Sequence, residues 1–205
     1  MKRKNRTHLA ISLVLFMMTV GTASAESDST LTWKMAFLRW NKTDYEAQPF
    51  VRPIKLSNGD EFQLYVQAER PAFLYIVEEG PEGIVKLLTR LSLRANTPLF
   101  LPAQDDSYTI AVPSGTEKIF LVISPGRQAN LENCLDLLTE QKGDRLKTSQ
   151  AVLDEVASIR QGASRVAEAP ERPVPMGGVT RGSKQIQATE FHGQSTYVKT
   201  IRLDH

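Results

Sequence analysis

The chain has a single cysteine among its 205 residues, Cys134, so no disulfide can form within it. Small secreted domains often depend on disulfides for stability, because they are too small to bury much apolar surface. A chain of this length has enough residues to build one domain around a hydrophobic core. We therefore expect packing, and not cross-links, to hold the fold together.

An apolar run long enough to cross a bilayer, roughly 20 residues, is also missing. The apolar stretch LAISLVLFMMTV (9–20) has 12 residues and follows four basic side chains. Small residues at Ala23 and Ala25 complete the order of a secretory signal peptide. We expect residues 1–25 to be removed by cleavage after Ala25, which leaves an exported, periplasmic or secreted protein that does not span the membrane.

No excess of one charge sign remains once this leader is set aside. Its four basic residues leave 21 Lys and Arg against 23 Asp and Glu, a formal net charge of −2. A nucleic-acid-binding domain would keep a basic excess on one face. We expect no nucleic-acid partner.

Residues with catalytic or metal-binding chemistry are scarce. After the leader the chain has two histidines, His192 and His205, whereas a zinc site takes three or four ligands. No oriented nucleophile can be named for His192, and the nucleophile sequence Gly-x-Ser-x-Gly is absent. Cys134 lies on the apolar face of a predicted helix, where a thiol usually acts as a small hydrophobic side chain. We expect no catalytic residue, no cofactor and no metal, and thus no enzyme.

Two glycine-containing segments resemble ligand-binding loops. EEGPEG (78–83) offers three glutamates, but a calcium loop needs ligands at alternate positions and a bidentate glutamate at the twelfth. Its glycines and proline favour a hairpin turn. GGVTRGSK (177–184) has the glycine spacing of a phosphate-binding loop, but Ser-Lys stands where Lys-Ser/Thr is needed. We expect neither segment to be a ligand site.

Strand patterns dominate residues 33–125. Alternating or fully apolar runs rich in β-branched and aromatic residues occur at WKMAFLRW (33–40), EFQLYVQA (61–68), AFLYIV (72–77), GIVKLL (83–88), SYTIAV (107–112) and KIFLVI (118–123). Trp33, Met35 and Phe37 share one face, and the fully apolar runs at 72–77 and 83–88 are typical of central strands. Turn signals every 8–12 residues predict a sandwich or a barrel.

The period becomes helical over residues 130–161. Two short helices are expected there, capped by Asn130 and by Thr148 or Ser149. Residues 162–184, rich in proline and glycine, predict a flexible loop.

A closing strand is expected at residues 195–204. The sequence thus predicts a single mainly β domain over residues 26–205. We expect an antiparallel β-sandwich-like fold with a helical hairpin inserted before the last strand.

The order of these strands carries a family resemblance. The matching motifs are Gly59-Asp60, Phe73–Ile76, Gly83–Leu88, Tyr108–Pro113 and Gly115–Pro125. In this order they resemble the bacterial domain of unknown function family 4384, over roughly residues 54–125, and YVKTIRLDH (197–205) is similar to the ending of that family. One departure is LLTR (87–90), where the family has a Leu-Phe-Pro-Asn-like segment. The resemblance implies a mostly β domain without known catalytic residues, in an accessory or binding role.

We therefore expect an exported protein-interaction or accessory module of the bacterial envelope, whose partner is another envelope protein. An open sheet edge can accept a strand from such a partner. The candidate interaction surface comprises Glu78, Glu79 and Glu82 at the hairpin turn, together with Arg172 and Arg181 in the predicted loop.

Two other functions remain open. A carbohydrate- or peptidoglycan-binding module would present an exposed row of aromatic rings that includes Tyr45, Tyr65 or Tyr197. A hydrolase with a cryptic site would bring His192 beside an acid such as Glu190 and a nucleophile.

Overall fold

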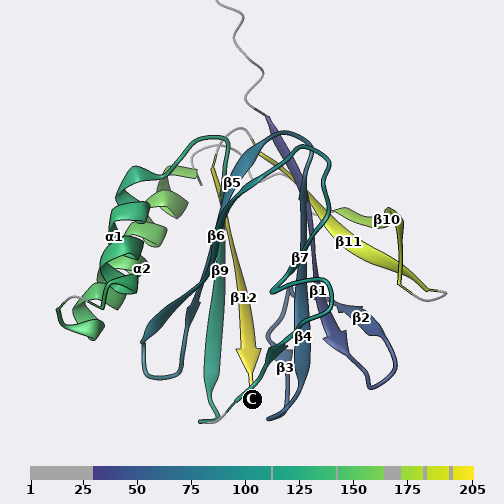
Figure 1. Ribbon diagram of the computed structural model, residues 1–205, viewed down its shortest axis with the longest axis horizontal. Coiled ribbons are helices and arrows are strands. Elements are labelled where there is room, and N and C mark those ends of the chain that lie inside the picture. Colours follow the sequence, from purple (N-terminus) through teal and green to yellow (C-terminus); the bar gives the residue numbers. More distant parts are fainter. Residues whose placement is uncertain (1–29, 112, 142, 164–171, 182–183, 194–195) are drawn as a thin grey trace, which may run out of the picture.

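The computed structural model consists of two β-sheets packed face to face, with two helices on the outside of one sheet (Figure 1). It describes residues 30–111, 113–141, 143–163, 172–181, 184–193 and 196–205, and of these the backbone alone for residues 172–181 and 184–186. The expected leader, residues 1–25, lies outside the described residues. The mainly β, sandwich-like fold with a helical hairpin is confirmed, but the hairpin precedes the last three strands and not only the last one, because residues 172–181 and 184–193 also form strands.

The seven-stranded sheet has the order β10-β11-β1-β4-β7, and β2 and β8 pair with β1 and β4. All of its pairs are antiparallel. The strands are β1 (Leu31–Trp40), β2 (Tyr45–Gln48), β4 (Glu61–Ala68), β7 (Leu99–Leu101), β8 (Tyr108–Thr109), β10 (Arg172–Arg181) and β11 (Lys184–Gly193).

The five-stranded sheet has the order β3-β12-β9-β5-β6. Its strands are β3 (Ile54–Lys55), β5 (Ala72–Glu79), β6 (Val85–Leu93), β9 (Thr116–Ser124) and β12 (Tyr197–Asp204). The short β3 runs parallel to β12, and the other pairs are antiparallel. The predicted closing strand therefore lies inside the sheet, between β3 and β9.

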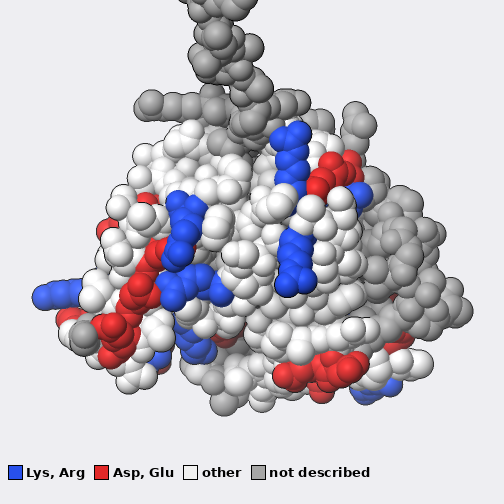
Figure 2. Space-filling model, turned by 45° about the horizontal axis from the view of Figure 1, so that its top comes forward, with Lys and Arg blue, Asp and Glu red and all other residues white. Residues whose placement is uncertain are grey.

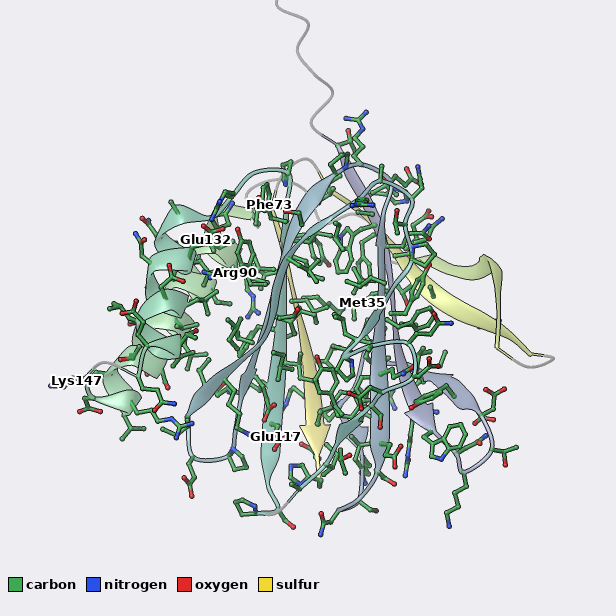
Figure 3. The ribbon with its side chains drawn as sticks, viewed as in Figure 1. Met35, Phe73, Arg90, Glu117, Glu132 and Lys147 are labelled. Atoms are coloured by element: carbon green, nitrogen blue, oxygen red, sulfur yellow. The ribbon has the colours of Figure 1, made fainter. Side chains whose placement is uncertain are left out.

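The main core lies between the two sheets. Trp33, Met35 and Phe37, which the period of two placed on one face, are fully buried there (Figure 3 labels Met35). Leu64 and Val66 of the neighbouring β4 belong to the same cluster. Burying a side chain of this size stabilises the fold by about 1.5–3 kcal/mol, so this face fixes how β1 and β4 pair.

A second apolar cluster joins the helices to the five-stranded sheet. The helices are α1 (Ala129–Thr139) and α2 (Arg145–Ala163), and both lie on the face of this sheet that points away from the other sheet (Figure 1). The helices contribute Leu131, Leu135, Val152 and Val156, which pack on Tyr75, Val77, Phe120 and Val122. The helical hairpin thus covers one sheet, as expected.

The predicted helix caps are wrong. Gln128 occupies the cap position of α1, but its side chain makes no capping hydrogen bond to the helix, and Asn130 lies inside the helix. The second helix begins earlier than expected, because Asp144 Oδ1 accepts a hydrogen bond from the Leu146 N–H at 2.9 Å. Asp is as good a cap as Ser, and Ser149 is consequently free to turn inward.

The flexible loop expected at residues 162–184 is wrong over residues 172–181. That segment is β10, which pairs with β11, and α2 continues to Ala163. Pro173 and Pro175 are tolerated because β10 is an edge strand, where a missing N–H breaks no ladder. A register shift between Pro175 and Thr180 accommodates the glycines. Residues 164–171 and 182–183 of the predicted loop lie outside the described residues.

Two further strand predictions need correction. The fully apolar run at 83–88 was expected to be central, but β6 is an edge strand whose second apolar face is covered by helices. The strand expected at 107–112 contracts to Tyr108–Thr109. Among the described residues, no helix is long and apolar enough to cross a membrane.

Candidate functional site

The acidic segment EEGPEG forms the turn of the β5–β6 hairpin, as predicted. The Gly80 N–H donates to the Ile84 carbonyl at 2.9 Å, and the Gly83 N–H donates to the Gly80 carbonyl at 3.0 Å. Gly83 has a φ of 74°, a conformation that favours glycine.

The acidic side chains of this turn are largely neutralised by neighbouring strands. Glu78 pairs with Lys86 at 3.3 Å, and Glu79 pairs with Lys118 at 2.9 Å. Glu82 is exposed in the turn. The turn is therefore not a concentrated negative surface.

The structure does not bring the two halves of the predicted interaction surface together. The glutamates lie in the β5–β6 hairpin of the five-stranded sheet, whereas Arg172 and Arg181 are the end residues of β10, at the edge of the other sheet. Figure 1 shows β10 and the helix-bearing β5–β6 sheet on opposite sides of the molecule. The side chains of both arginines lie outside the described part of the structure.

A polar network at the start of α1 fixes the helical hairpin to β5. The Tyr75 hydroxyl donates to Glu132 Oε1 at 2.6 Å and accepts the Gln128 N–H at 3.1 Å. Arg127 donates to both oxygens of the same carboxylate, at 2.6–3.1 Å. Burial and the bond to Glu132 raise the pKa of Tyr75 to about 12. The bonds from Arg127 and Tyr75 hold the pKa of Glu132 below its usual value.

Further contacts hold the helices against the sheet. Figure 3 shows Glu132 and Arg90 where α1 meets the sheet, and Arg90 pairs with Asp136 at 2.6 Å. Arg160 of α2 donates to the Thr200 hydroxyl of β12. The relative position of helices and sheet is thus set by polar contacts at several points as well as by the apolar cluster.

The helical hairpin formed by α1 and α2 covers only part of the free edge of β6. The Ile84 carbonyl points toward β5, where it accepts the Gly80 N–H. The N–H of the next residue, Val85, points the opposite way, because the C=O and N–H of one peptide group are antiparallel. It donates to the buried Ser149 hydroxyl at 3.0 Å. By strand alternation the N–H and C=O of Leu87 face the same side. These Leu87 groups therefore lie on the side of β6 that pairs with no other strand in the described sheet.

A groove of about 480 Å³ lies between this edge and the ends of the two helices. Its walls come from three consecutive residues of β6 and from the last turn of α1, the connection and the first turn of α2. Apolar contributions are Val85, Leu87, Leu137 and Leu138, and Leu137 is 51% exposed. A volume of this size suits several side chains of a bound segment.

The charged residues that line the groove are basic. They are Lys86 of β6 and Arg145 of α2, and the described lining contains no acid. Lys86 is shared with Glu78, but Arg145 has no ion-pair partner among the described residues. On the face shown in Figure 2, basic and acidic side chains are intermixed. The groove can therefore bind an apolar segment that carries a carboxylate.

Other sheet edges offer less to a partner strand. β2, β3, β7 and β8 have two to four residues each. β10 has ten residues but contains Pro173 and Pro175, which lack the N–H that a partner strand would use. β6, with nine residues and no proline, is the better edge for strand addition in the described chain.

The residues required by the hydrolase hypothesis do meet. His192 Nε2 lies 3.0 Å from Glu190 Oε1, and His192 Nδ1 lies 3.1 Å from the Thr32 hydroxyl. Lys34 pairs with the other Glu190 oxygen at 3.2 Å. These residues are direct cross-strand partners of β1 and β11. We interpret them as a polar ladder that holds the register of these strands, since such pairs stabilise a sheet.

The aromatic residues do not form an exposed row. Trp33 and Tyr65 are buried, and Tyr197 packs against Trp33 and Phe191 in the core. Trp40 and Tyr45 remain partly exposed, with ring centroids 5.1 Å apart and ring planes tilted by 52°. Of the aromatic residues considered for carbohydrate binding, only the pair Trp40 and Tyr45 at the end of β1 remains partly exposed together.

The remaining sequence candidates can be placed briefly. Cys134 is half-buried on α1, and burial raises the pKa of its thiol. The segment 177–184, which resembles a phosphate-binding loop, includes the end of β10 and the start of β11. Its residues 182–183 are not among the described residues. In the described part of the chain, no group of three or more His, Cys, Asp or Glu side chains is arranged to hold a metal ion.

The groove was missed by the sequence analysis because its walls come from segments about 50 residues apart. A weak signal existed in Leu137, which falls off the apolar face formed by Leu131, Leu135 and Leu138 of the same helix. A single exposed leucine is common on protein surfaces, so this signal alone could not locate the groove.

Comparison with known proteins identifies a family but no characterised relative. No curated protein and no solved structure matches the chain. Residues 55–127 match the family model described as Domain of unknown function (DUF4384). This segment runs from β3 to the loop before α1 and includes three strands of the five-stranded sheet. The resemblance drawn from the strand motifs is confirmed: residues 55–127 match this family of domains of unknown function.

Proposed function

We propose that this protein is an exported, non-enzymatic interaction module of the bacterial envelope, and that it binds an extended segment of a partner protein in the groove between β6 and the helical hairpin. Export is supported by the signal-like first 25 residues. The observation that carries the proposal is the free edge of β6 beside apolar and basic groove walls.

The backbone of the partner would be recognised by strand addition. β6 is paired on one side only, and its Leu87 N–H and C=O face the groove side. An extended segment laid along this edge gains main-chain hydrogen bonds, which give affinity without regard to sequence. The helices limit the length of edge that is open, so we expect a short segment.

The side chains of the partner would be selected by the groove walls. Leu137 and Leu138 face β6 across the groove and offer an apolar pocket for alternate side chains. Lys86 and Arg145 favour a carboxylate on the same segment. The expected ligand is an extended stretch that alternates apolar and acidic residues.

The proposal is tested by selecting peptides from a random display library with the chain lacking its first 25 residues. We expect enrichment of alternating apolar and acidic residues, with protection from hydrogen exchange at the Leu87 amide when a selected peptide is bound. The substitution Leu137→Asp places a charge in the groove and should weaken binding at least about tenfold. Its matched control is Leu146→Asp, since Leu146 is similarly exposed, on α2, but does not line the groove.

Charge reversal tests the specificity. In the double variant Lys86→Glu and Arg145→Glu, we expect the selected peptides to become basic. Peptides that show no charge preference, or binding that survives Leu137→Asp, would contradict the proposal. Self-association that is lost in Leu137→Asp would also contradict it, because the occupant would then be a second copy of the chain.

A further inference from the structure

The groove between β6 and the helical hairpin is closed at one end. The buried Ser149 hydroxyl, near the start of α2, accepts the Val85 N–H at 3.0 Å. A strand added along this edge cannot continue past Val85, because the N–H that would pair with it is already bonded to the helix. The start of α2 and the β5–β6 turn lie at the same end of the sheet (Figure 1).

The other end of the groove leads along the edge of β6. The strand continues to Leu93, and on this side it pairs with no other strand of the described sheet. The polar contact between Asp136 of α1 and Arg90, at 2.6 Å, joins two side chains and not the backbone of the edge. An extended segment can therefore follow the edge toward Leu93, but it has to stop at Val85.

A groove with one closed end suits the end of a chain better than the middle of one. An internal segment would have to turn sharply away from β6 at the closed end, and the residues beyond the turn would lose contact with the groove. A chain terminus can lie against the closed end while its backbone stays extended. Proteins recognise both C-terminal carboxylates and N-terminal amines in this way.

The charge at the closed end selects the carboxyl terminus. Arg145, the first residue of α2, lines the groove there and makes no ion pair with another described residue. Lys86 also lines the groove, but its ammonium is shared with Glu78 at 3.3 Å. Arg145 would repel a terminal amine, whereas its guanidinium can donate two parallel hydrogen bonds to a terminal carboxylate.

The acid next to Arg145 in the sequence is engaged by the helix. Asp144 Oδ1 accepts the N–H groups of Leu146 and Lys147, at 2.9 and 3.4 Å. Asp144 is thus directed at the start of α2, where a negative charge is favourable, and it does not line the groove. Arg145 therefore remains available to a ligand.

The closed end also fixes the direction and the side chains of the bound chain. If its carboxyl end lies at Val85, where β6 begins, the chain extends back toward Leu93 and runs antiparallel to β6. The side chains of Val85 and Leu87 belong to the apolar cluster on the helix side, and Leu137 and Leu138 line the groove from α1. The last residues of the bound chain should therefore be apolar.

We propose that the groove binds the C-terminal tail of a partner protein, with the terminal carboxylate on Arg145 and the tail antiparallel to β6. This inference rests on the proposed function, since it specifies which segment of the partner the groove binds. The tail ends in apolar residues, and its backbone pairs with the N–H and C=O of Leu87.

The test compares chain ends of different chemistry. Two synthetic libraries of the same random octapeptides, one with a free carboxyl terminus and one with a C-terminal amide, are offered to the chain lacking residues 1–25. We expect peptides that end in apolar residues to be retained from the free-acid library. The peptide retained best should bind at least about tenfold more weakly as its amide, or after addition of two glycines to its end.

Variants and a spin label locate the carboxylate and the direction. Arg145→Gln should remove most of the difference between acid and amide. Its matched control is Lys147→Gln, because Lys147 is exposed in the same turn of α2 but does not line the groove (Figure 3). A nitroxide on the first residue of the bound peptide should attenuate the amide signal of Ser92 more than that of Val85.

The outcomes separate this inference from the proposed function. Equal binding of acid and amide, or a preference for the acid that survives Arg145→Gln, would overturn the C-terminal assignment and leave peptide binding in the groove standing. Stronger attenuation at Val85 than at Ser92 would overturn the antiparallel direction. If neither library contains a peptide that binds, the proposed function is overturned, and this inference with it.

Discussion

The hydroxyl of Tyr75 offers a sharp test of how the helical hairpin is held. Tyr75→Phe keeps the ring in the apolar cluster but removes the donor to Glu132 and the acceptor for the Gln128 N–H. A hydrogen bond to a charged group contributes about 1.5–3 kcal/mol. We expect the free energy of unfolding to fall by about 2 kcal/mol, which lowers the urea midpoint by about 1 M if the m-value is about 2 kcal/mol/M.

The companion variant Arg127→Gln should cost less. Arg127 holds the same carboxylate with more hydrogen bonds, but its side chain is 67% exposed, so water screens the pair. If the number of hydrogen bonds decided the loss of stability, Arg127→Gln would lose more than Tyr75→Phe. If solvent screening decides it, Tyr75→Phe loses more. Urea titrations of both variants at pH 7 decide between the two. A larger loss for Arg127→Gln than for Tyr75→Phe would refute the reasoning.

The deficit of Tyr75→Phe should also depend on pH. The folded state lowers the pKa of Glu132, so the stabilisation from its charged form is present above the ordinary carboxyl value of 4.5 and is lost as pH falls through the lowered value. The difference in unfolding free energy between wild type and Tyr75→Phe should therefore shrink below pH 4.5. A constant difference down to pH 2.5 would contradict the charge-assisted interpretation.

Three further substitutions test other contacts. Ser149→Ala leaves the buried Val85 N–H unpaired and should cost about 1–3 kcal/mol of stability in thermal unfolding, with faster hydrogen exchange at Val85. Gly115→Ala places a Cβ 2.8 Å from the Pro81 Cβ and should destabilise by about 1–3 kcal/mol, measured in urea. Burial raises the pKa of Glu117, so its charged form opposes folding above that pKa; Glu117→Gln should match wild type in melting temperature at pH 3 and exceed it at pH 7.

Matched controls keep the first two of these tests specific. Ser158→Ala, at an exposed position of α2, should leave stability unchanged, as should Gly126→Ala, where an added Cβ meets no atom within 4 Å. Equal losses in a variant and its control would contradict the contact in question. A Glu117→Gln protein less stable than wild type at pH 7 would show that the contact with His205, at 3.3 Å, outweighs the cost of burial.

The sequence predicted the parts of the fold that depend on local periodicity. The alternation of Trp33, Met35 and Phe37 gave the buried face of β1, and the spacing of Leu131 and Leu135 gave the buried face of α1. The hairpin turn followed from its glycines and proline. In each case the pattern and the tertiary environment demand the same residues.

Features that depend on distant pairing could not be predicted. β10 contains Pro173, Pro175 and two adjacent glycines, and only the ladder with β11 makes it a strand. The sequence predicted that Ser149 could cap a helix, but its hydroxyl instead accepts a hydrogen bond from the Val85 N–H, 64 residues away. The local sequence around Ser149 contains no sign of this distant donor. The candidate site shares this property, since β6 and the helix ends are brought together by the fold alone.

The positions of β1 and β12 in the sheets determine which fragments of this protein can fold on their own. Both strands lie outside residues 55–127, yet β1 sits between β11 and β4, and β12 sits between β3 and β9. A fragment cut at the borders of the family match would expose two strand edges that are interior in the whole chain, and exposed edges of this kind promote aggregation. The unit of sequence similarity is thus smaller than the unit that folds, and fragments for experiment should begin before Leu31 and retain Asp204.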